Sequence, residues 1–196
     1  MYHPSSIEIK ALSQQVQQMH ESLIILCGHT EGLLELKFAT FLTKIAQPLN
    51  NLNLFLYYGN YIKLANLEYG ILNENGVVQP KKATFVGSGP MLLTSIIMAS
   101  QHMKSTHFDN FDIDEVASDI ASLVRMSKEE KMKILGHLRK YIKEGGALLV
   151  RTAKEARAFL YPVVEENDLL DFELLSIFHP INDVINSVIF VRKPVV

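Results

Sequence analysis

Apolar residues recur at intervals of three and four along residues 5–75. The positions that share helical faces in this way are Leu12, Val16, Met19, Leu23, Leu34, Phe38, Phe41, Leu42 and Ile45. A helix with such a stripe buries it against a neighbouring element. The segment 47–54 interrupts the pattern with Pro and Asn residues. We therefore predict two or three packed helices in this part of the chain.

The pattern changes after residues 73–82, which are rich in turn-forming residues. Short apolar runs now alternate with glycine turns and helical stretches, as in α/β folds. We predict strands at 83–86 and 147–151, a further strand that ends in Asp112, and a helix in the segment that Pro162 ends. Two β-rich runs around Pro180, Asn182 and Asp183 predict a C-terminal antiparallel hairpin.

The first of these strands ends in the turn Gly87-Ser88-Gly89-Pro90. The glycines have no Cβ and adopt positive φ readily, so their backbone can approach a ligand closely. Pro90 suits the first position of a helix, where its missing N–H costs nothing. Asp112 follows at about the offset from which an acidic residue binds ribose hydroxyls in nucleotide-binding folds. We expect Gly87, Ser88, Gly89, Pro90 and Asp112 to bind a nucleotide-like ligand.

Leu92 stands where the dinucleotide-binding fingerprint has its third glycine. This departure favours S-adenosylmethionine over NAD as the ligand. The alternative is a tight strand-to-helix turn without a ligand, followed by an aspartate that caps a helix.

Two acidic residues, Glu31 and Glu35, fall on the apolar side of the second predicted helix. A carboxylate turned toward a core is paired, protonated or functional, because an unpaired buried charge is costly. Tyr61 lies on the next helix and is placed to meet Glu35 in a cleft beside the glycine turn. The alternative is a position at the rim of the core or a structural ion pair, for example with Lys63.

Composition narrows the function classes. A chain of 196 residues with 48% hydrophobic content can bury a core, and its net charge of -2 shows no basic excess for nucleic acid. One cysteine excludes an intramolecular disulfide, and the histidines show no metal-ligand spacing.

With no long apolar run and no signal-peptide pattern at the start, we expect a soluble, cytoplasmic protein without a membrane partner. No oligomeric state follows from the sequence.

Four stretches carry a more specific signal. They read FVGSGPMLLTSIIMA (85–99), FDNFDID (108–114), KEEKMKILGHLRKYIKEGGALLVRTAKEARAFLYPVV (128–164) and FELLSIFHPINDVINSVIF (172–190). Together they resemble the plant-type nicotianamine synthase family, from about Leu12 to Lys193. Members of that family join three molecules of S-adenosylmethionine into nicotianamine and release methylthioadenosine each time.

The resemblance implies a fold and a set of site residues. It implies a helical N-terminal part (1–75) and a Rossmann-like domain (76–196) with a methyltransferase-type sheet and the C-terminal hairpin. The family's implicated glutamate and tyrosine correspond to Glu35 and to Tyr61, the last tyrosine of the YYGNY segment. S-adenosylmethionine would be a substrate, and no intrinsic metal is implied.

The interval 114–147 is shorter than in family members and contains only helix-like sequence. It leaves room for one crossover, so the sheet should lack two strands. We predict that residues 83–86 then pair directly with 147–150, which would leave the adenine pocket open on one side. Two other functions remain: an inactive remnant of the family, or a small-molecule methyltransferase.

Overall fold

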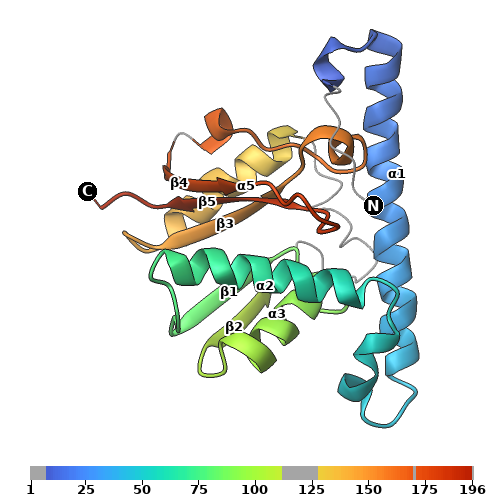
Figure 1. The fold of residues 1–196 in the computed structure, drawn as a ribbon, viewed down its shortest axis with the longest axis vertical. Coiled ribbons are helices and arrows are strands. Elements are labelled where there is room, and N and C mark those ends of the chain that lie inside the picture. The colour runs from blue at the N-terminus through green and yellow to red at the C-terminus, as the bar shows by residue number, and fades with distance from the viewer. Residues whose placement is uncertain (1–7, 112–127, 170, 196) are drawn as a thin grey trace. The chain divides into compact units, whose positions relative to one another are not determined.

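The computed structural model describes residues 8–111, 128–169 and 171–195 (Figure 1). Its helices and strands, in chain order, are α1 (Gln14–Leu42), α2 (Tyr58–Glu74), β1 (Lys82–Val86), α3 (Leu93–Ile97), β2 (His107–Phe111), α5 (Lys128–Tyr141), β3 (Ala147–Thr152), β4 (Glu173–Phe178) and β5 (Ser187–Arg192). Short 3-10 helices lie at Ile9–Ala11, Pro48–Leu54, Glu155–Phe159 and Glu166–Leu169, and a π-helical turn at Met98–His102.

The chain forms two compact units. The described residues within 1–27 and 124–196 make up the first unit, and those within 28–123 make up the second. The division falls inside α1, so this helix contributes to both. The domain boundary predicted between residues 75 and 76 lies within the second unit, and that boundary stays a prediction. No helix in the described part of the chain is long and apolar enough to cross a membrane.

The second unit is built on a two-stranded parallel sheet. β1 pairs with β2 in register from Lys82 with His107 to Val86 with Phe111. Helices α2 and α3 and the π-helical turn supply the buried cluster beside it, to which Phe85 and Phe108 add their rings; its buried members are Ala65, Ile97 and Met98. Helix packing therefore stabilises a sheet too small to be stable alone.

The first unit contains a three-stranded antiparallel sheet in the order β3-β5-β4. Its central strand is fully covered, since Val188, Ile189, Phe190 and Val191 are at most 1% exposed. Helix α5 contributes Leu135 to the core cluster on this sheet, and Met132 packs against the same cluster. The predicted C-terminal hairpin is confirmed: β4 and β5 are antiparallel neighbours, with an irregularity between Leu174 and Ser176.

The predicted pairing of residues 83–86 with 147–150 would join the two units, and it stays a prediction. Among the described residues, β1 has its ladder with β2, and β3 has its ladder with β5. Helix residues of the same unit pack beside each sheet. The interval 114–127 of the shortened region lies outside the described residues.

Candidate functional site

The glycine turn has the backbone conformation that its sequence predicts. Gly87 and Gly89 both have φ of 71°, in the left-handed region that side chains with a Cβ avoid. The N–H of Gly87 donates to the carbonyl of Phe111 at 2.9 Å, which ties the turn to the end of β2. The carboxyl ends of two parallel strands thus meet at the turn, where ligands bind in α/β folds.

The chain after the turn differs from the prediction. Helix α3 begins at Leu93, so the prediction that Pro90 occupies the first helical position is wrong. The residue before the helix, Leu92, has φ of 50° and ψ of 27°. The position of the missing third glycine therefore keeps a conformation that glycine favours, although its residue is leucine.

Glu35 and Tyr61 meet, as the sequence indicated. The Tyr61 hydroxyl donates a short hydrogen bond to Oε1 of Glu35, and the contact is partly buried. Glu35 comes from α1 and Tyr61 from α2, both within the second unit. The half-buried carboxylate of Glu35 thus accepts a hydrogen bond from a phenol whose ring packs against apolar clusters.

Packing relates this pair to the glycine turn. Tyr61 packs against a core cluster whose buried members include Met91 and Leu93, the residues that follow the turn. It also packs against the cluster of Ile97 and Met98. The carboxylate and phenol therefore share a unit and a core with the segment that leaves the turn, which gives them a fixed relation to it.

Sequence reasoning missed Glu68. This residue lies on α2 two turns after Tyr61, on the same face, and is only 3% exposed. The available signal was its position among apolar residues of the same helix, since Leu64, Ala65 and Ile71 are buried with it. A second carboxylate is thus buried on α2, two turns from Tyr61.

Two buried amide oxygens in the second unit also stand out. Oδ1 of Asn60 and Oδ1 of Asn110 are covered, and neither accepts a hydrogen bond within the described residues. Asn60 precedes Tyr61, and Asn110 lies on β2 opposite Phe85. Unpaired buried acceptors are uncommon in native proteins.

The predicted residue Asp112 and the question of a metal site are considered next in the described residues. Asp112, the predicted acidic partner of the turn, lies outside the described residues. In the part of the chain that the structure describes, no group of three or more His, Cys, Asp or Glu side chains is placed to hold a metal ion.

Comparisons with known proteins decide the family. The family model described as nicotianamine synthase protein matches residues 1–125 and 119–196. This chain belongs to the nicotianamine synthase family. The nicotianamine synthase of Solanum lycopersicum is 42% identical over 97% of the chain and 72% of the relative. Nicotianamine synthase 3 of Arabidopsis thaliana is 43% identical over 97% of the chain and 72% of the relative.

A solved structure shows the fold. The crystal structure of a mutant of MtNAS in complex with S-adenosylmethionine matches with a TM-score of 0.77 at 16% identity, over 93% of this chain and 80% of that one. The α/β fold of a Rossmann-like, methyltransferase-type protein with a helical N-terminal part and a C-terminal antiparallel hairpin is thereby established.

The comparisons also locate a difference within the nicotianamine synthase family. The alignment with the tomato relative spans 227 positions, more than the 196 residues of this chain, so the relative has residues that this chain lacks. The two segments matched by the family model meet at residues 119–125. The discontinuity therefore falls in the interval that the sequence identified as shortened.

Proposed function

We propose that this chain is a nicotianamine synthase that condenses three molecules of S-adenosylmethionine by aminocarboxypropyl transfer. The observation that carries the proposal is the hydrogen bond between Tyr61 and Glu35, formed beside the core that follows the glycine turn. Family membership at 42% identity over 97% of the chain supports the reaction class.

Aminocarboxypropyl transfer to an amine requires a group that accepts a proton. The positively charged sulfur of S-adenosylmethionine activates each carbon attached to it. A neutral α-amine of a second molecule attacks the aminocarboxypropyl carbon next to sulfur. A C–N bond forms, the C–S bond breaks, and its electron pair stays on the sulfur of methylthioadenosine. The amine must lose a proton, which the Glu35 carboxylate accepts while the Tyr61 hydroxyl donates to it.

The glycine turn takes the nucleoside end in this proposal. Gly87 and Gly89 hold positive φ and expose their amides without a Cβ. Ser88, Pro90 and Asp112 complete the predicted contacts. S-adenosylmethionine is thus a substrate here, and no metal takes part in the proposed steps.

Incubation with S-adenosylmethionine alone tests the function. Purified protein should release methylthioadenosine and form nicotianamine, both measured by mass spectrometry. Release of adenosylhomocysteine instead would select a methyltransferase. A folded protein that forms none of these products would contradict both.

One observation favours a second function. The residues that this chain lacks relative to its family members fall in the interval 114–147, where the sequence predicts that the sheet loses two strands. An inactive family remnant that retains the fold is therefore the competing proposal. It predicts no heat of binding on titration with S-adenosylmethionine, whereas binding in the micromolar range would refute it.

A cytoplasmic location is part of the proposal, together with a small-molecule substrate and no nucleic-acid or membrane partner. The net charge of -2 supports the absence of a nucleic-acid partner. Imaging of a fluorescent fusion and fractionation of cell extracts test the location.

A further inference from the structure

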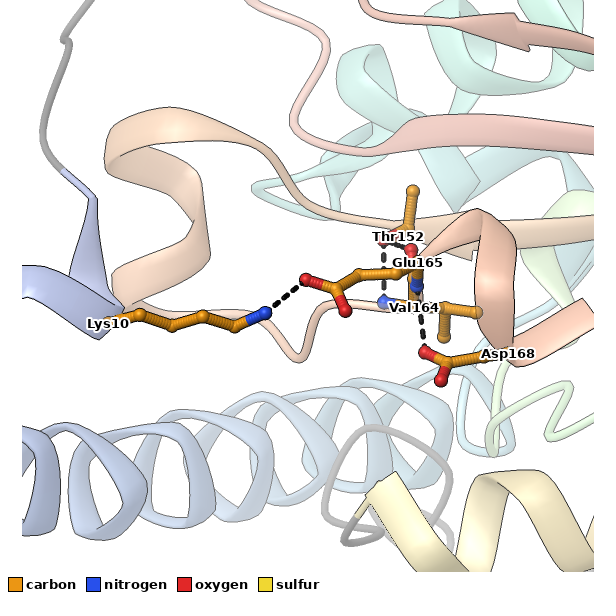
Figure 2. A network of polar contacts seen from close by, with 5 residues as sticks. All are labelled: Lys10, Thr152, Val164, Glu165 and Asp168. Atoms are coloured by element: carbon orange, nitrogen blue, oxygen red, sulfur yellow. Dashed lines mark hydrogen bonds and ion pairs between the residues drawn. The ribbon is translucent and has the colours of Figure 1, made fainter.

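The end of the three-stranded sheet at which β3 finishes is held by a network of polar contacts (Figure 2). The Thr152 hydroxyl donates to the Val164 carbonyl at 2.9 Å and accepts from the Val164 N–H at 2.8 Å. Nζ of Lys10 donates to Oε1 of Glu165 at 2.5 Å, and the N–H of Glu165 donates to Oδ2 of Asp168 at 2.9 Å. The polar groups of this network are therefore satisfied within the protein itself.

The segment 153–163, which follows β3, has less helix than the sequence predicts. The prediction of a helix that Pro162 ends is wrong, because the structure has only the 3-10 turn Glu155–Phe159. The Arg157 guanidinium donates to the carbonyl of Pro180 at 2.9 Å. A side-chain hydrogen bond, rather than a helical ladder, thus holds this segment.

The opposite end of the same sheet contains a cavity. The cavity has a volume of about 330 Å³ and is lined by Gly136, Arg139, Lys140, Asp171 and Lys193. The first three of these residues lie on α5. Asp171 stands two residues before β4, and Lys193 directly follows β5.

Backbone hydrogen bonds place the cavity at the amino ends of β3 and β4. The N–H of Gly145 donates to the carbonyl of Lys193 at 2.9 Å, and the N–H of Lys193 donates to the carbonyl of Gly146 at 2.9 Å. Gly146 directly precedes β3. In α/β folds the ligands of the reaction bind outside the carboxyl ends of the strands. A ligand in this cavity would therefore occupy a different site from a reacting substrate.

The lining of the cavity carries an excess of positive charge. Three of its residues are cations and one is a carboxylate, which leaves a formal charge of +2. Nη1 of Arg139 lies 3.9 Å from Oδ1 of Asp171, and the two side chains are 42% and 67% exposed. This distance is too long for a hydrogen bond, and water screens so exposed a pair. Asp171 therefore neutralises little of the charge.

The guanidinium of Arg139 also has an unused donor. Its Nε is covered from solvent and has no hydrogen-bond partner within the described residues. A buried donor without an acceptor is costly, so an acceptor at this position would be favourable. The N–H groups of a guanidinium form a fork that binds two oxygens of one oxyanion. An oxyanion in the cavity would supply the missing acceptor.

Lys193 is held at the cavity by the end of α5. Its Nζ donates to the carbonyl of Arg139 at 2.9 Å and to that of Ile142 at 2.8 Å. These bonds use two of the three donors of the ammonium group. Cations are favourable at the C-terminal end of a helix, which accounts for these two bonds. It does not account for the covered, unpartnered Nε of Arg139.

A phosphate monoester fits these features. At neutral pH it carries a charge of about −1.5 to −2 and has three acceptor oxygens, which matches the charge of the lining. The volume lies at the lower end of the range of roughly 300–1,000 Å³ for small-molecule sites. The Asp171 carboxylate suits a ligand hydroxyl, because a carboxylate only accepts. We propose that this cavity binds the phosphate group of a small, hydroxylated phosphate ester. The inference does not depend on the proposed function.

Titration calorimetry with glucose 6-phosphate tests the site. We expect the wild type to bind it and not to bind glucose, which lacks the phosphate. Arg139→Met should weaken the affinity about tenfold to a hundredfold, the range for a lost hydrogen bond between charged groups. Lys133→Met is the matched control: it removes an exposed lysine of the same helix that does not line the cavity, so the affinity should be unchanged.

Inorganic phosphate and succinate identify the group that is bound. Weaker binding of inorganic phosphate than of glucose 6-phosphate, with both dependent on Arg139, supports an ester. Equal binding of the two would overturn the ester and assign the cavity to free phosphate. Succinate that binds as tightly as glucose 6-phosphate would overturn the choice of a phosphate over a carboxylate.

Arg139→Lys and thermal melts distinguish a binding site from a helix cap. This variant keeps the charge at the end of α5 but loses the fork, so the melting temperature should stay near that of the wild type while the affinity falls. If Arg139→Met lowers the melting temperature but binds glucose 6-phosphate like the wild type, the cations only stabilise the helix and the inference is overturned. A folded wild type that binds neither glucose 6-phosphate nor inorganic phosphate would also overturn it.

Discussion

At the scale of single residues, the partly buried hydrogen bond from Tyr61 to Glu35 is the central contact of the candidate site. It gives the half-buried carboxylate of Glu35 a hydrogen-bond donor, and burial of a charge without one would be costly. The roles of both residues in proton transfer stay predictions, and their substitution tests them.

We predict that Glu35→Gln and Tyr61→Phe lower turnover much more than they lower the affinity for S-adenosylmethionine. Loss of a group that accepts or relays a proton costs about 100- to 10,000-fold in rate. Steady-state formation of methylthioadenosine and titration calorimetry measure the two effects separately. Parallel losses in rate and affinity would instead assign the pair a role in binding or folding. Leu34→Met, at a nearby exposed position of α1, serves as the control.

His179 gives a pH dependence with a defined sign. Its folded-state pKa is lowered, mainly by burial, from the ordinary value of 6.5. Between these two pKa values the unfolded chain binds a proton that the folded chain does not, so the free energy of unfolding falls as the pH drops below 6.5. We predict a smaller fall for His179→Gln in urea unfolding at about pH 7.5 and pH 5.5. Identical pH dependence in the two proteins would contradict this.

At the scale of elements, the strand-to-helix turn after β1 depends on backbone conformations that few residues adopt. Gly87 and Gly89 have φ of 71°, and Leu92 has φ of 50° before α3 begins. Pro90 stands between them, outside any helix. The turn is thus an irregular loop of six residues, 87–92, rather than a short link into a long helix.

We predict that Gly89→Ala destabilises the protein by about 1–2 kcal/mol, because alanine in the left-handed region brings its Cβ against the backbone. It should also weaken S-adenosylmethionine binding, since the turn is the proposed nucleoside contact. Gly70→Ala is the matched control: it lies inside α2, and an added Cβ there meets no atom within 4 Å. That change should instead stabilise by about 0.5–1 kcal/mol. Urea unfolding and calorimetry measure both variants.

At the scale of the whole molecule, the two sheets differ in the elements that cover their strands. β5 is enclosed between β3 and β4, whereas the β1–β2 pair depends on α2 and α3 for its cover. The helices, strands and the hydrogen bond of the candidate site are all formed in a chain shorter than its family members. The shortened interval therefore leaves a formed candidate site in the second unit.

We predict that S-adenosylmethionine raises the melting temperature. A ligand at about a hundred times its Kd adds about 2.7 kcal/mol. For a chain of this size that corresponds to a rise of roughly 5–10 °C in a differential scanning experiment. The same ligand should give no rise in a Gly87→Ala, Gly89→Ala double variant. An unchanged melting temperature of the wild type at saturating ligand would favour the inactive remnant.

Much of the structure follows from the sequence alone. Helical periodicity predicted the helices within residues 14–74 and the approach of Tyr61 to Glu35. The β-rich runs predicted the strands β1, β3 and β5. The glycine positions predicted the positive φ of Gly87 and Gly89. These features depend on residues close in sequence or on one apolar face, which a local pattern records. The partners of β1 and β3 and the left-handed backbone of Leu92 and Glu155 were decided by tertiary structure. Ladders and strained conformations are fixed by packing between distant segments, and that packing overrides what any local pattern specifies.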